Sequence, residues 1–534
     1  MKFPYYIIFA FLTLFTPLAF GGGEPWGLFV FNFICIIFSF FILFNKHKIT
    51  VNSLSKIILY LFSFIIFITL LQLVNQHNFL QKPAYLPFTL ARYYSLEGLS
   101  LFFSLSMIFL ALTQIVSHGK DIKNLILILT VSAVITTLIS IGFRTEYIYT
   151  FTDLTLYSSF GPFASRNHGA QFVMMSFFLS LFLWLPHFIL VREQRLPKNN
   201  IAYLFCSLIL FLGVFFTHSR GGLISLLLGL FVLCSLYFWY FSQTNIKKII
   251  KIIISAIILM IFVHITITYS TSLGLRQFGS GSDEARMALY TAALNMLKDF
   301  PLTGVGFDAF SAAIDAYIPF ALKAFPRYLH NDWLELLLSF GYIFGAVIFG
   351  FIGVIITRII GLFKNLSPKK RIRLAILCAG LSGFSFTALV DFPFHLPACA
   401  MLFFFALAFV GTKTFDKNEK TFNFPITLKI ILICFSGFLI WTNFQYVRAW
   451  RNLVFVKQLA PTIQARELNK SLEYYPSLTY IRHTLNSKYK ILKTKSLSEE
   501  EKQTIKQDLH RLAGEYLKQY PKDSVISRIF VLTK

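Results

Sequence analysis

The chain has 534 residues, of which 56% are hydrophobic and only 14% are charged. Soluble domains average roughly 45–50% apolar and about 25% charged residues, so this composition excludes an ordinary soluble protein. A net charge of +25 would suggest nucleic acid binding in a soluble chain. Here, however, apolar stretches long enough to cross a bilayer recur from the N-terminus to about residue 443. We therefore expect a polytopic helical membrane protein with no nucleic acid partner.

Apolar segments of sufficient length predict thirteen membrane spans. The first, Tyr5–Phe20, resembles a signal peptide in length, but no small-residue cleavage site follows it, so we expect it to remain as a helix. The spans lie near residues 5–20, 26–44, 56–74, 99–117, 124–143, 170–190, 201–217, 221–242, 252–270, 334–357, 374–390, 396–412 and 427–443. We expect an all-α polytopic fold with about 12–13 transmembrane helices, a membrane domain over residues 1–443 and a soluble helical tail over residues 444–534.

The distribution of basic residues predicts the orientation of the chain. If the N-terminus is cytoplasmic, 22 Lys and Arg residues fall on the cytoplasmic side, against 10 in the longer loops of the opposite side. The positive-inside rule favours this arrangement. The other 17 basic residues lie in the tail, which an odd number of spans places outside the cytoplasm. We therefore predict that the large loop, residues 271–333, and the tail both lie outside the cytoplasm.

Ionisable residues are rare inside the predicted spans. No span carries Asp, Glu, Lys or Arg near its middle, and His264 is the ionisable side chain that lies well inside one. Ion-coupled transporters usually need such groups at mid-membrane, so a proton-driven transporter is disfavoured, whereas a lipid flippase with few charges stays open. The six cysteines lie in apolar segments without metal-ligand spacing, and they predict neither disulfides nor a zinc site.

Polar residues collect instead in the loops of the predicted external face. Arg166, Asn167 and His168 precede the sixth span, and Thr217–Gly222 forms the whole connection between two spans. In the second segment, two glycines allow a tight turn at a helix start, where backbone amides favour an anion. Arg220 adds a permanent charge suited to phosphate. An interfacial arginine that extends toward water at a helix end is the alternative interpretation.

The large external loop contributes two further candidates. Ser282–Phe300 has the pattern of an amphipathic helix. Arg286 lies near its start, where a positive charge opposes the helix dipole. Either an anionic ligand or an ordinary ion pair with a neighbouring acid would explain an arginine at this position. Pro301–Gly306 carries glycines that mark a turn. His330, followed by Asn331 and Asp332, stands at the next span, where an acid can orient it, although a lone histidine is often structural.

A short Pro-rich connection, Val390–Ala398, adds Asp391 and His395 as secondary candidates. The external histidines His168, His218, His330 and His395 lie in separate loops without an H-x-x-x-H pair, so we predict no metal site.

The tail has helical periodicity in Ala449–Leu459, Thr462–Tyr474 and Glu499–Tyr520, with proline-containing turns between the segments. Two interpretations stay open: a short array of helical hairpins similar to tetratricopeptide repeats, and a solvated basic helical tail. No clean 34-residue period distinguishes them.

Taken in order, these motifs resemble those of the O-antigen ligase and polymerase superfamily of bacterial inner-membrane glycosyltransferases. The resemblance covers about residues 15–412. It is carried by Pro17–Trp26, Arg166–His168, Ser219–Gly222, Arg286 with Pro301–Gly306, His330–Asp332 and Asp391–Pro397. Each motif is short, and their order and topology together make the set specific.

The resemblance implies a GT-C-like membrane fold and a metal-independent enzyme that needs no cofactor. Such an enzyme transfers a glycan from an undecaprenyl-diphosphate carrier to a lipid A-core, growing-glycan or protein acceptor. On the matching positions, the catalytic residues are Arg220, Arg286 and His330. Arg166, Asn167, His168, Asp391 and His395 are then substrate-binding residues. The thirteenth span and the tail depart from a typical ligase, so a polysaccharide polymerase and a protein oligosaccharyltransferase stay open, as does a lipid-linked glycan transporter or assembly factor.

Overall fold

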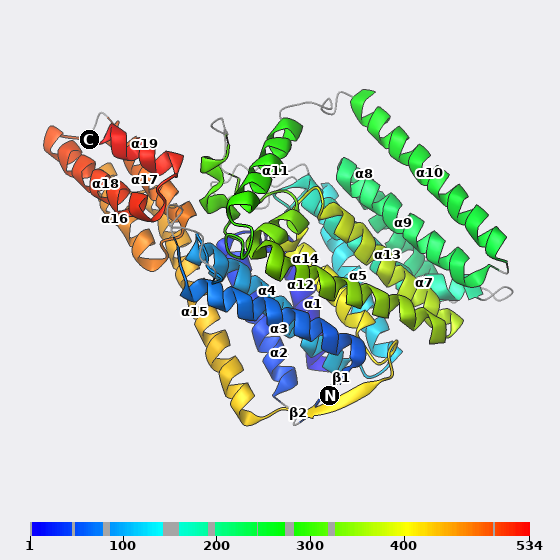
Figure 1. Ribbon diagram of the computed structural model, residues 1–534. Coiled ribbons are helices and arrows are strands. Elements are labelled where there is room, and N and C mark those ends of the chain that lie inside the picture. Colours follow the sequence, from blue (N-terminus) through cyan, green and yellow to red (C-terminus); the bar gives the residue numbers. More distant parts are fainter. Residues whose placement is uncertain are drawn as a thin grey trace. The chain divides into compact units, whose positions relative to one another are not determined.

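The structure is a computed structural model that describes residues 3–44, 48–77, 86–142, 160–190, 198–242, 244–272, 282–318, 326–494 and 497–534 (Figure 1). The chain forms two compact units. The first unit contains Met1–Phe62, Phe103–Ser280 and Gly350–Ile433, and the second contains Ser63–Phe102, Gly281–Phe349 and Cys434–Lys534. Each unit is described by itself below.

Every predicted span coincides with a helix. These helices are α1 (Phe3–Leu18), α2 (Pro25–Leu43), α3 (Ser53–Val74), α4 (Arg92–Ile115), α5 (Gly119–Gly142), α7 (Arg166–Leu190), α8 (Lys198–Phe216), α9 (Arg220–Phe241), α10 (Asn245–Ser272), α12 (Asp332–Leu362), α13 (Pro368–Thr387), α14 (Pro397–Val410) and α15 (Ile426–Val456). Within the described residues, ten helices are long and apolar enough to cross a membrane, and α1 and α14 are shorter apolar helices. The all-helical polytopic fold is therefore confirmed.

Several helices extend beyond the predicted apolar runs, among them α4 and α15. Helix α4 begins seven residues before its apolar run, because Arg92–Gly98 adds polar turns to the same helix. Helix α15 continues to Val456. The domain boundary that we predict after residue 443 falls inside this continuous helix, and the division into two domains stays a prediction.

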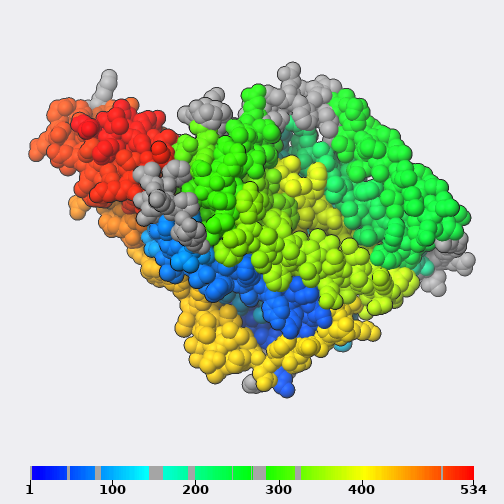
Figure 2. All heavy atoms as spheres, viewed as in Figure 1, coloured from blue at the N-terminus to red at the C-terminus, as the bar shows by residue number. Residues whose placement is uncertain are grey.

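The outer surface of the first unit is apolar where lipid would contact it. The most apolar window of α10 has no buried residue, and Ile257 and Phe262 expose 45% and 50% of their surface. Figure 2 shows this helix as a continuous green surface, and Figure 1 shows it beside α9. A helix that is apolar on all sides and exposed is stable in lipid and would be an aggregation hazard in water.

A small sheet, which the hydropathy pattern does not predict, is present beside the helices. Strand β1 (Lys48–Asn52) pairs antiparallel with β2 (Glu419–Asn423), with Lys48 opposite Asn423. The two strands lie in different loops that the basic-residue pattern assigns to the cytoplasmic side, and their pairing requires that both loops lie on one side. The comparison of 22 with 10 basic residues, on which the predicted orientation depends, includes several that lie outside the described residues: Lys2, Lys46, Lys82, Arg144, Arg192, Arg195, Arg276 and Lys323.

Close packing in the first unit depends on glycines at helix crossings. Helix α13 packs against α7 and α9, and α7 also packs against α8 (Figure 1). A Cβ added at Gly229 would lie 2.5 Å from the Phe178 ring, and one at Gly383 would lie 2.8 Å from the Ser225 carbonyl oxygen. Small residues therefore set the distance between these helices, as in other membrane helix bundles.

In the second unit, α12 is interrupted at Gly341, whose φ of 66° and ψ of −175° break the helix. The Pro301–Gly306 segment pairs with the groups that the break frees. The Leu338 and Ser339 carbonyls accept from Val305 and Gly306, and the Tyr342 amide donates to Pro301. A Cβ at Gly304 would lie 2.2 Å from the Leu338 oxygen, so the close approach requires glycine there. The Pro301–Gly306 segment, whose glycines predict a turn, thus supplies hydrogen-bond partners for the backbone groups that the break in α12 leaves unpaired.

The tail forms helices α16 (Pro461–Tyr474), α17 (Leu478–Leu492), α18 (Glu499–Gln519) and α19 (Ser524–Leu532), each packed on the next in the chain. Their shared apolar core includes Ala91, Tyr94 and Ala309 from outside the tail. The Tyr475 hydroxyl donates to the Tyr93 carbonyl at 2.9 Å. The tail therefore packs on the start of α4 and on the segment that follows α11 (Ser282–Asp299), and it lies on the same side of the membrane as they do.

A buried ion cluster joins this tail to the short 3-10 helix η3 (Ile314–Ala316). Arg482 Nε donates to Asp523 Oδ2 at 2.7 Å, and Arg482 Nη2 lies 3.4 Å from Asp315 Oδ2. The Ser524 amide donates to the same Asp315 oxygen at 3.0 Å. Arg482 and Asp523 are both almost inaccessible to solvent.

Replacing Arg482 by methionine is expected to destabilise the tail by on the order of 3 kcal/mol, because Asp523 then stays buried without its cation. Limited proteolysis of the full chain measures this as faster release of tail fragments. The exposed Arg466→Met variant is the matched control and should behave as wild type. Adding Asp523→Leu should restore part of the loss, and unchanged proteolysis of Arg482→Met would contradict a stabilising role.

Candidate functional site

In the first unit, the starts of α7 and α9 are tied together by Ser219. This residue caps α9, since its Oγ accepts from the Gly222 amide at 3.1 Å, and it donates to Asn167 Oδ1 at 2.9 Å. His218 has a φ of 51°, so the turn before the cap is tight. Arg220, the first residue of α9, is thereby held beside the first turn of α7, which contains Arg166 and Asn167.

The structure corrects one expectation for the two glycines in this turn. The Gly222 amide donates to the Ser219 hydroxyl, so it belongs to the cap. A Cβ at Gly222 would lie 2.4 Å from the Ala170 Cβ, which shows that this glycine allows α9 to approach α7. A Cβ added at Gly221 would have Ser219 Oγ as its nearest neighbour, at 4.0 Å. The two glycines therefore have different roles, and Gly221 has the open surroundings.

His168 and Asp391, which are far apart in sequence, form a buried pair. His168 Nε2 lies 3.8 Å from Asp391 Oδ1, and both side chains are almost fully buried. The Phe392 ring contacts the imidazole edge-on, with ring centres 4.7 Å apart. Two of the predicted site residues, from distant loops, therefore lie close together.

The N-terminal glycine motif joins the same group of segments. Gly21 and Gly22, in the 3-10 helix η1 (Phe20–Gly22), have φ values of 68° and 77°. A Cβ on them would lie 3.0 Å from Leu396 and 2.7 Å from Pro397. Only glycine combines this backbone conformation with so close a contact. The Pro17–Trp26 motif thus supports the 3-10 helix η5 (Pro393–His395) and the start of α14.

A hydrogen-bonded layer beneath these segments has no clear signal in the sequence. Thr387 of α13 donates to Gln171 Oε1 of α7 at 2.7 Å, and Thr387 also bonds Ser225 of α9. All three side chains are buried. They join α7, which carries Arg166–His168, and α9, which starts at Arg220, to the end of α13, which precedes Asp391. Only their i+3 to i+5 spacing from those residues could have indicated them.

In the second unit, His330 stands in a fixed turn. Its φ of 59° lies in the left-handed region. Its carbonyl accepts from the Tyr290 hydroxyl at 2.8 Å, and the preceding Leu329 amide donates to Glu335 Oε2 at 2.8 Å. The acid that bonds the backbone of this turn is Glu335. Orientation of the imidazole by Asp332 stays a prediction.

Arg286 lies on α11 one turn before Tyr290, so the two share a face of that helix. Because Tyr290 bonds the His330 carbonyl, this face of α11 is directed toward the turn that carries His330. The predicted amphipathic helix over Ser282–Phe300 is present. Arg286 and His330 thus belong to neighbouring parts of the second unit, and Arg220 belongs to the first.

Arg327 has a structural role that the sequence does not reveal. Its guanidinium donates to the Asp308 carboxylate at 2.9 Å and lies 3.4 Å from Glu97. It also stacks on the Tyr94 ring at 3.5 Å. Burial opposes the arginine charge, but Asp308 raises the Arg327 pKa well above its usual value. The cation therefore fixes the end of the external loop to α4.

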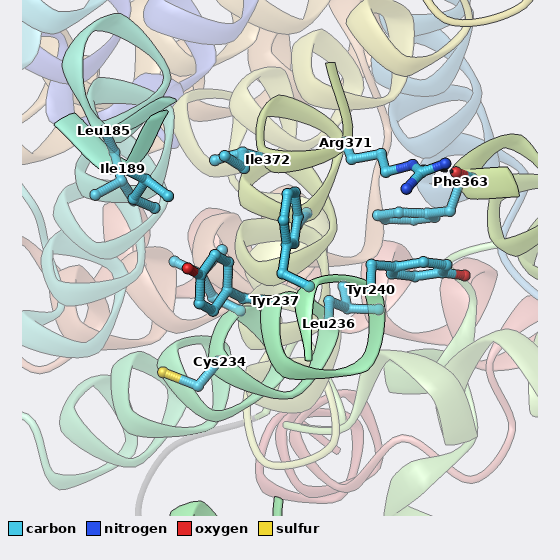
Figure 3. A pocket seen from close by; sticks show the side chains of 12 residues that line it. Leu185, Ile189, Cys234, Leu236, Tyr237, Tyr240, Phe363, Arg371 and Ile372 are labelled. Carbon is cyan, nitrogen blue, oxygen red and sulfur yellow. Dashed lines mark hydrogen bonds between the residues drawn. The ribbon is translucent and has the colours of Figure 1, made fainter. Parts of the chain in front are cut away.

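The apolar pocket in Figure 3 is separate from the candidate site around Arg220. It has a volume of about 170 Å³ and lies between the C-terminal ends of α7 and α9 and the start of α13. The Tyr240 and Phe363 rings stack there 4.8 Å apart. Arg220 starts α9 and the pocket surrounds its last turns, so at 1.5 Å per residue roughly 20–30 Å separate the two.

Comparison with protein-family models identifies the central segment. Residues 205–350 match the O-antigen ligase family. The match covers just over a quarter of the chain and includes Arg220, Arg286, Pro301–Gly306 and His330. The family resemblance that the motifs indicate is thus confirmed for this segment. O-antigen ligase family members are glycosyltransferases that act on lipid-linked glycans. A search of curated proteins gave no match to the chain.

Proposed function

We propose that the protein transfers a glycan from an undecaprenyl-diphosphate carrier to an acceptor at the periplasmic face of the bacterial inner membrane. The observation that carries the proposal is the family match, because its residues 205–350 enclose Arg220, Arg286 and His330 together. The polytopic helical fold supports it, since the donor is itself a membrane lipid.

The roles of the three residues follow from the reaction. The anomeric C–O bond to diphosphate breaks, and negative charge develops on the leaving diphosphate. Arg220 and Arg286 stabilise that charge through bidentate hydrogen bonds, in place of a divalent metal. The acceptor hydroxyl forms the new glycosidic bond and gives its proton to neutral His330. The products are the transferred glycan and undecaprenyl diphosphate.

Arg166, Asn167, His168, Asp391 and His395 are proposed to bind the sugar or the carrier phosphates. The hydrogen bond between Ser219 and Asn167 supports this for the α7 segment, because it holds that segment beside Arg220. The buried His168–Asp391 pair supports a positioning role for both residues, since it joins the start of α7 to the connection between α13 and α14.

The acceptor is proposed to be the lipid A-core, as in an O-antigen ligase, and a growing glycan or a protein would accept by the same chemistry. The packing of the tail beside the loop that carries Arg286 and His330 supports a role of the tail in presenting the acceptor.

Purified full-length protein, supplied with an undecaprenyl-diphosphate glycan and each acceptor, tests the function. The expected result is a glycosidic product together with free undecaprenyl diphosphate. The acceptor that becomes glycosylated distinguishes a ligase from a polymerase or a protein oligosaccharyltransferase. Movement of intact donor across vesicle membranes, without product, would show a transporter and overturn the proposal.

Orientation is tested by labelling single introduced cysteines in intact cells. Positions 47, 195 and 370 are expected to be protected from a membrane-impermeant reagent, and the exposed positions 298 and 490 to react, because the basic loops favour the cytoplasm. Reaction at 298 with protection at 490 would also contradict the contact between the tail and the external loop.

A further inference from the structure

A basic cavity opens in the first unit, at the ends of α5, α7, α8 and α13. It has a volume of about 200 Å³, far more than a single water requires. The polar residues that line it are Lys123, His187, Asn199, Asn200, Lys369 and Arg373. Nineteen residues of α7 separate His168 from His187, which corresponds to about 30 Å. The cavity therefore lies at the opposite helix ends from the Arg220 turn and is independent of the proposed catalytic residues.

Three cations meet at this cavity. The charges of Lys369 and Arg373 both act on Lys123, and like charges so placed destabilise the fold unless an anion offsets them. All three belong to the first two turns of α5 or α13, where the helix dipole is already positive. The Arg373 guanidinium even approaches Gly119, the first residue of α5, since its Nη1 lies 3.7 Å from a Cβ built there.

None of the described residues that line the cavity is acidic. Asp121, the acid nearest to Lys123 in the chain, accepts from the Ser117 and His118 amides at 2.8 and 3.0 Å. The buried Arg373 Nε has no hydrogen-bond partner among the described residues, and its guanidinium lies 4.7 Å from the Phe182 ring centre. The protein itself thus leaves the cationic charge of this cavity without a counterion in the described part of the chain.

Arg371, two residues earlier on α13, shows the contrast. It donates to the Phe363 and Lys364 carbonyls at 2.8 and 3.0 Å and caps the 3-10 helix η4 (Phe363–Asn365), beside the apolar pocket of Figure 3. These hydrogen bonds give Arg371 a structural role. Among the residues that the structure describes, no hydrogen bond to a backbone carbonyl gives Arg373 a comparable role.

We propose that this cavity binds a phosphate group. Guanidinium nitrogens bind phosphate oxygens bidentately, lysines add point charges, and helix N-termini favour anions, so the three features select the same ligand. The phosphate belongs either to the headgroup of an anionic phospholipid or to a free phosphate anion. Binding links α5 to α13 and stabilises the helix ends that the basic loops assign to the cytoplasmic surface.

Thermal unfolding of the detergent-solubilised full chain tests this site. One arm adds inorganic phosphate against sodium chloride of equal ionic strength, and the other adds short-chain phosphatidylglycerol against phosphatidylcholine. If the cavity binds phosphate, the midpoint temperature of unfolding of the wild-type protein should rise by several degrees in at least one arm. Arg373→Gln and Lys123→Gln should weaken the apparent affinity by about tenfold or more. Lys364→Gln, which removes an exposed cation outside the cavity, should retain the full shift.

The exposed Lys369 gives a third variant, Lys369→Gln, that removes a cation without disturbing packing, in case Arg373→Gln fails to fold. A shift in the lipid arm alone identifies a headgroup, and a shift with inorganic phosphate identifies a free anion. Either supports the site. Equal loss of the shift in Lys364→Gln would reveal general charge screening, and no shift in either arm would show that no phosphate binds, so both outcomes overturn the proposal.

Discussion

Replacing Arg220 or Arg286 by lysine is expected to lower glycan transfer by roughly 10²–10³-fold, the usual cost of removing one fixed donor from a developing negative charge. Lysine keeps the charge but offers a single ammonium, which cannot clamp a diphosphate bidentately. Both side chains are partly exposed and neither is part of a packed apolar core, so the variants should insert and accumulate. Single-turnover transfer with the purified donor measures the loss.

Arg358→Lys is the matched control for these variants, because Arg358 is exposed at the far end of α12 and lies outside every proposed site. It should transfer at the wild-type rate. Full activity in Arg220→Lys or Arg286→Lys would remove that residue from the diphosphate-binding role. Loss of the folded protein, measured by size-exclusion chromatography, would instead indicate a structural role.

Loss of the His330 imidazole is expected to reduce transfer by roughly 10²–10⁴-fold, the usual contribution of a general base, while donor binding persists. Asparagine is the better replacement, since it tolerates the left-handed conformation of residue 330 more readily than alanine does. The bonds that hold the turn use the backbone of residues 329 and 330, so they survive the substitution.

Measuring donor affinity and turnover on the same purified protein decides between a catalytic and a structural His330. His330→Asn and His330→Ala should both keep the wild-type donor affinity. Tyr290→Phe serves as the control, because it removes the bond to the His330 carbonyl and keeps the imidazole; it should lose far less turnover. Near-normal turnover per folded molecule in His330→Asn would exclude the residue as the base.

The helices could be predicted because lipid imposes a simple length and hydropathy requirement on each span. The β1–β2 sheet could not, since Lys48–Asn52 and Glu419–Asn423 are short, mixed in polarity and paired across most of the chain. The break in α12 was missed for a related reason. Gly341 is one of several glycines in that helix, and only the Pro301–Gly306 segment, distant in sequence, explains why the helix is interrupted there.

For the candidate site, the short motifs identified residues that interact within the first unit, such as Asn167 with Ser219 and His168 with Asp391. The supporting residues Gln171, Ser225 and Thr387 were missed because buried polar residues in an apolar helix look like ordinary tolerated substitutions. The Arg327 cluster was missed because ion pairs between loops leave no local pattern.

The small sheet has a consequence for biosynthesis. Domains and segments form in the order in which the chain emerges, N-terminus first. Strand β1 is complete before α3 enters the membrane, but its partner β2 emerges only after α14. Asn52, whose side chain donates to the Gly411 carbonyl, must wait equally long. The early helices therefore lack the β1–β2 pairing until nearly the whole membrane part has been inserted. A single missed span would leave the two strands on opposite sides of the membrane, so their pairing requires that every intervening span has been inserted.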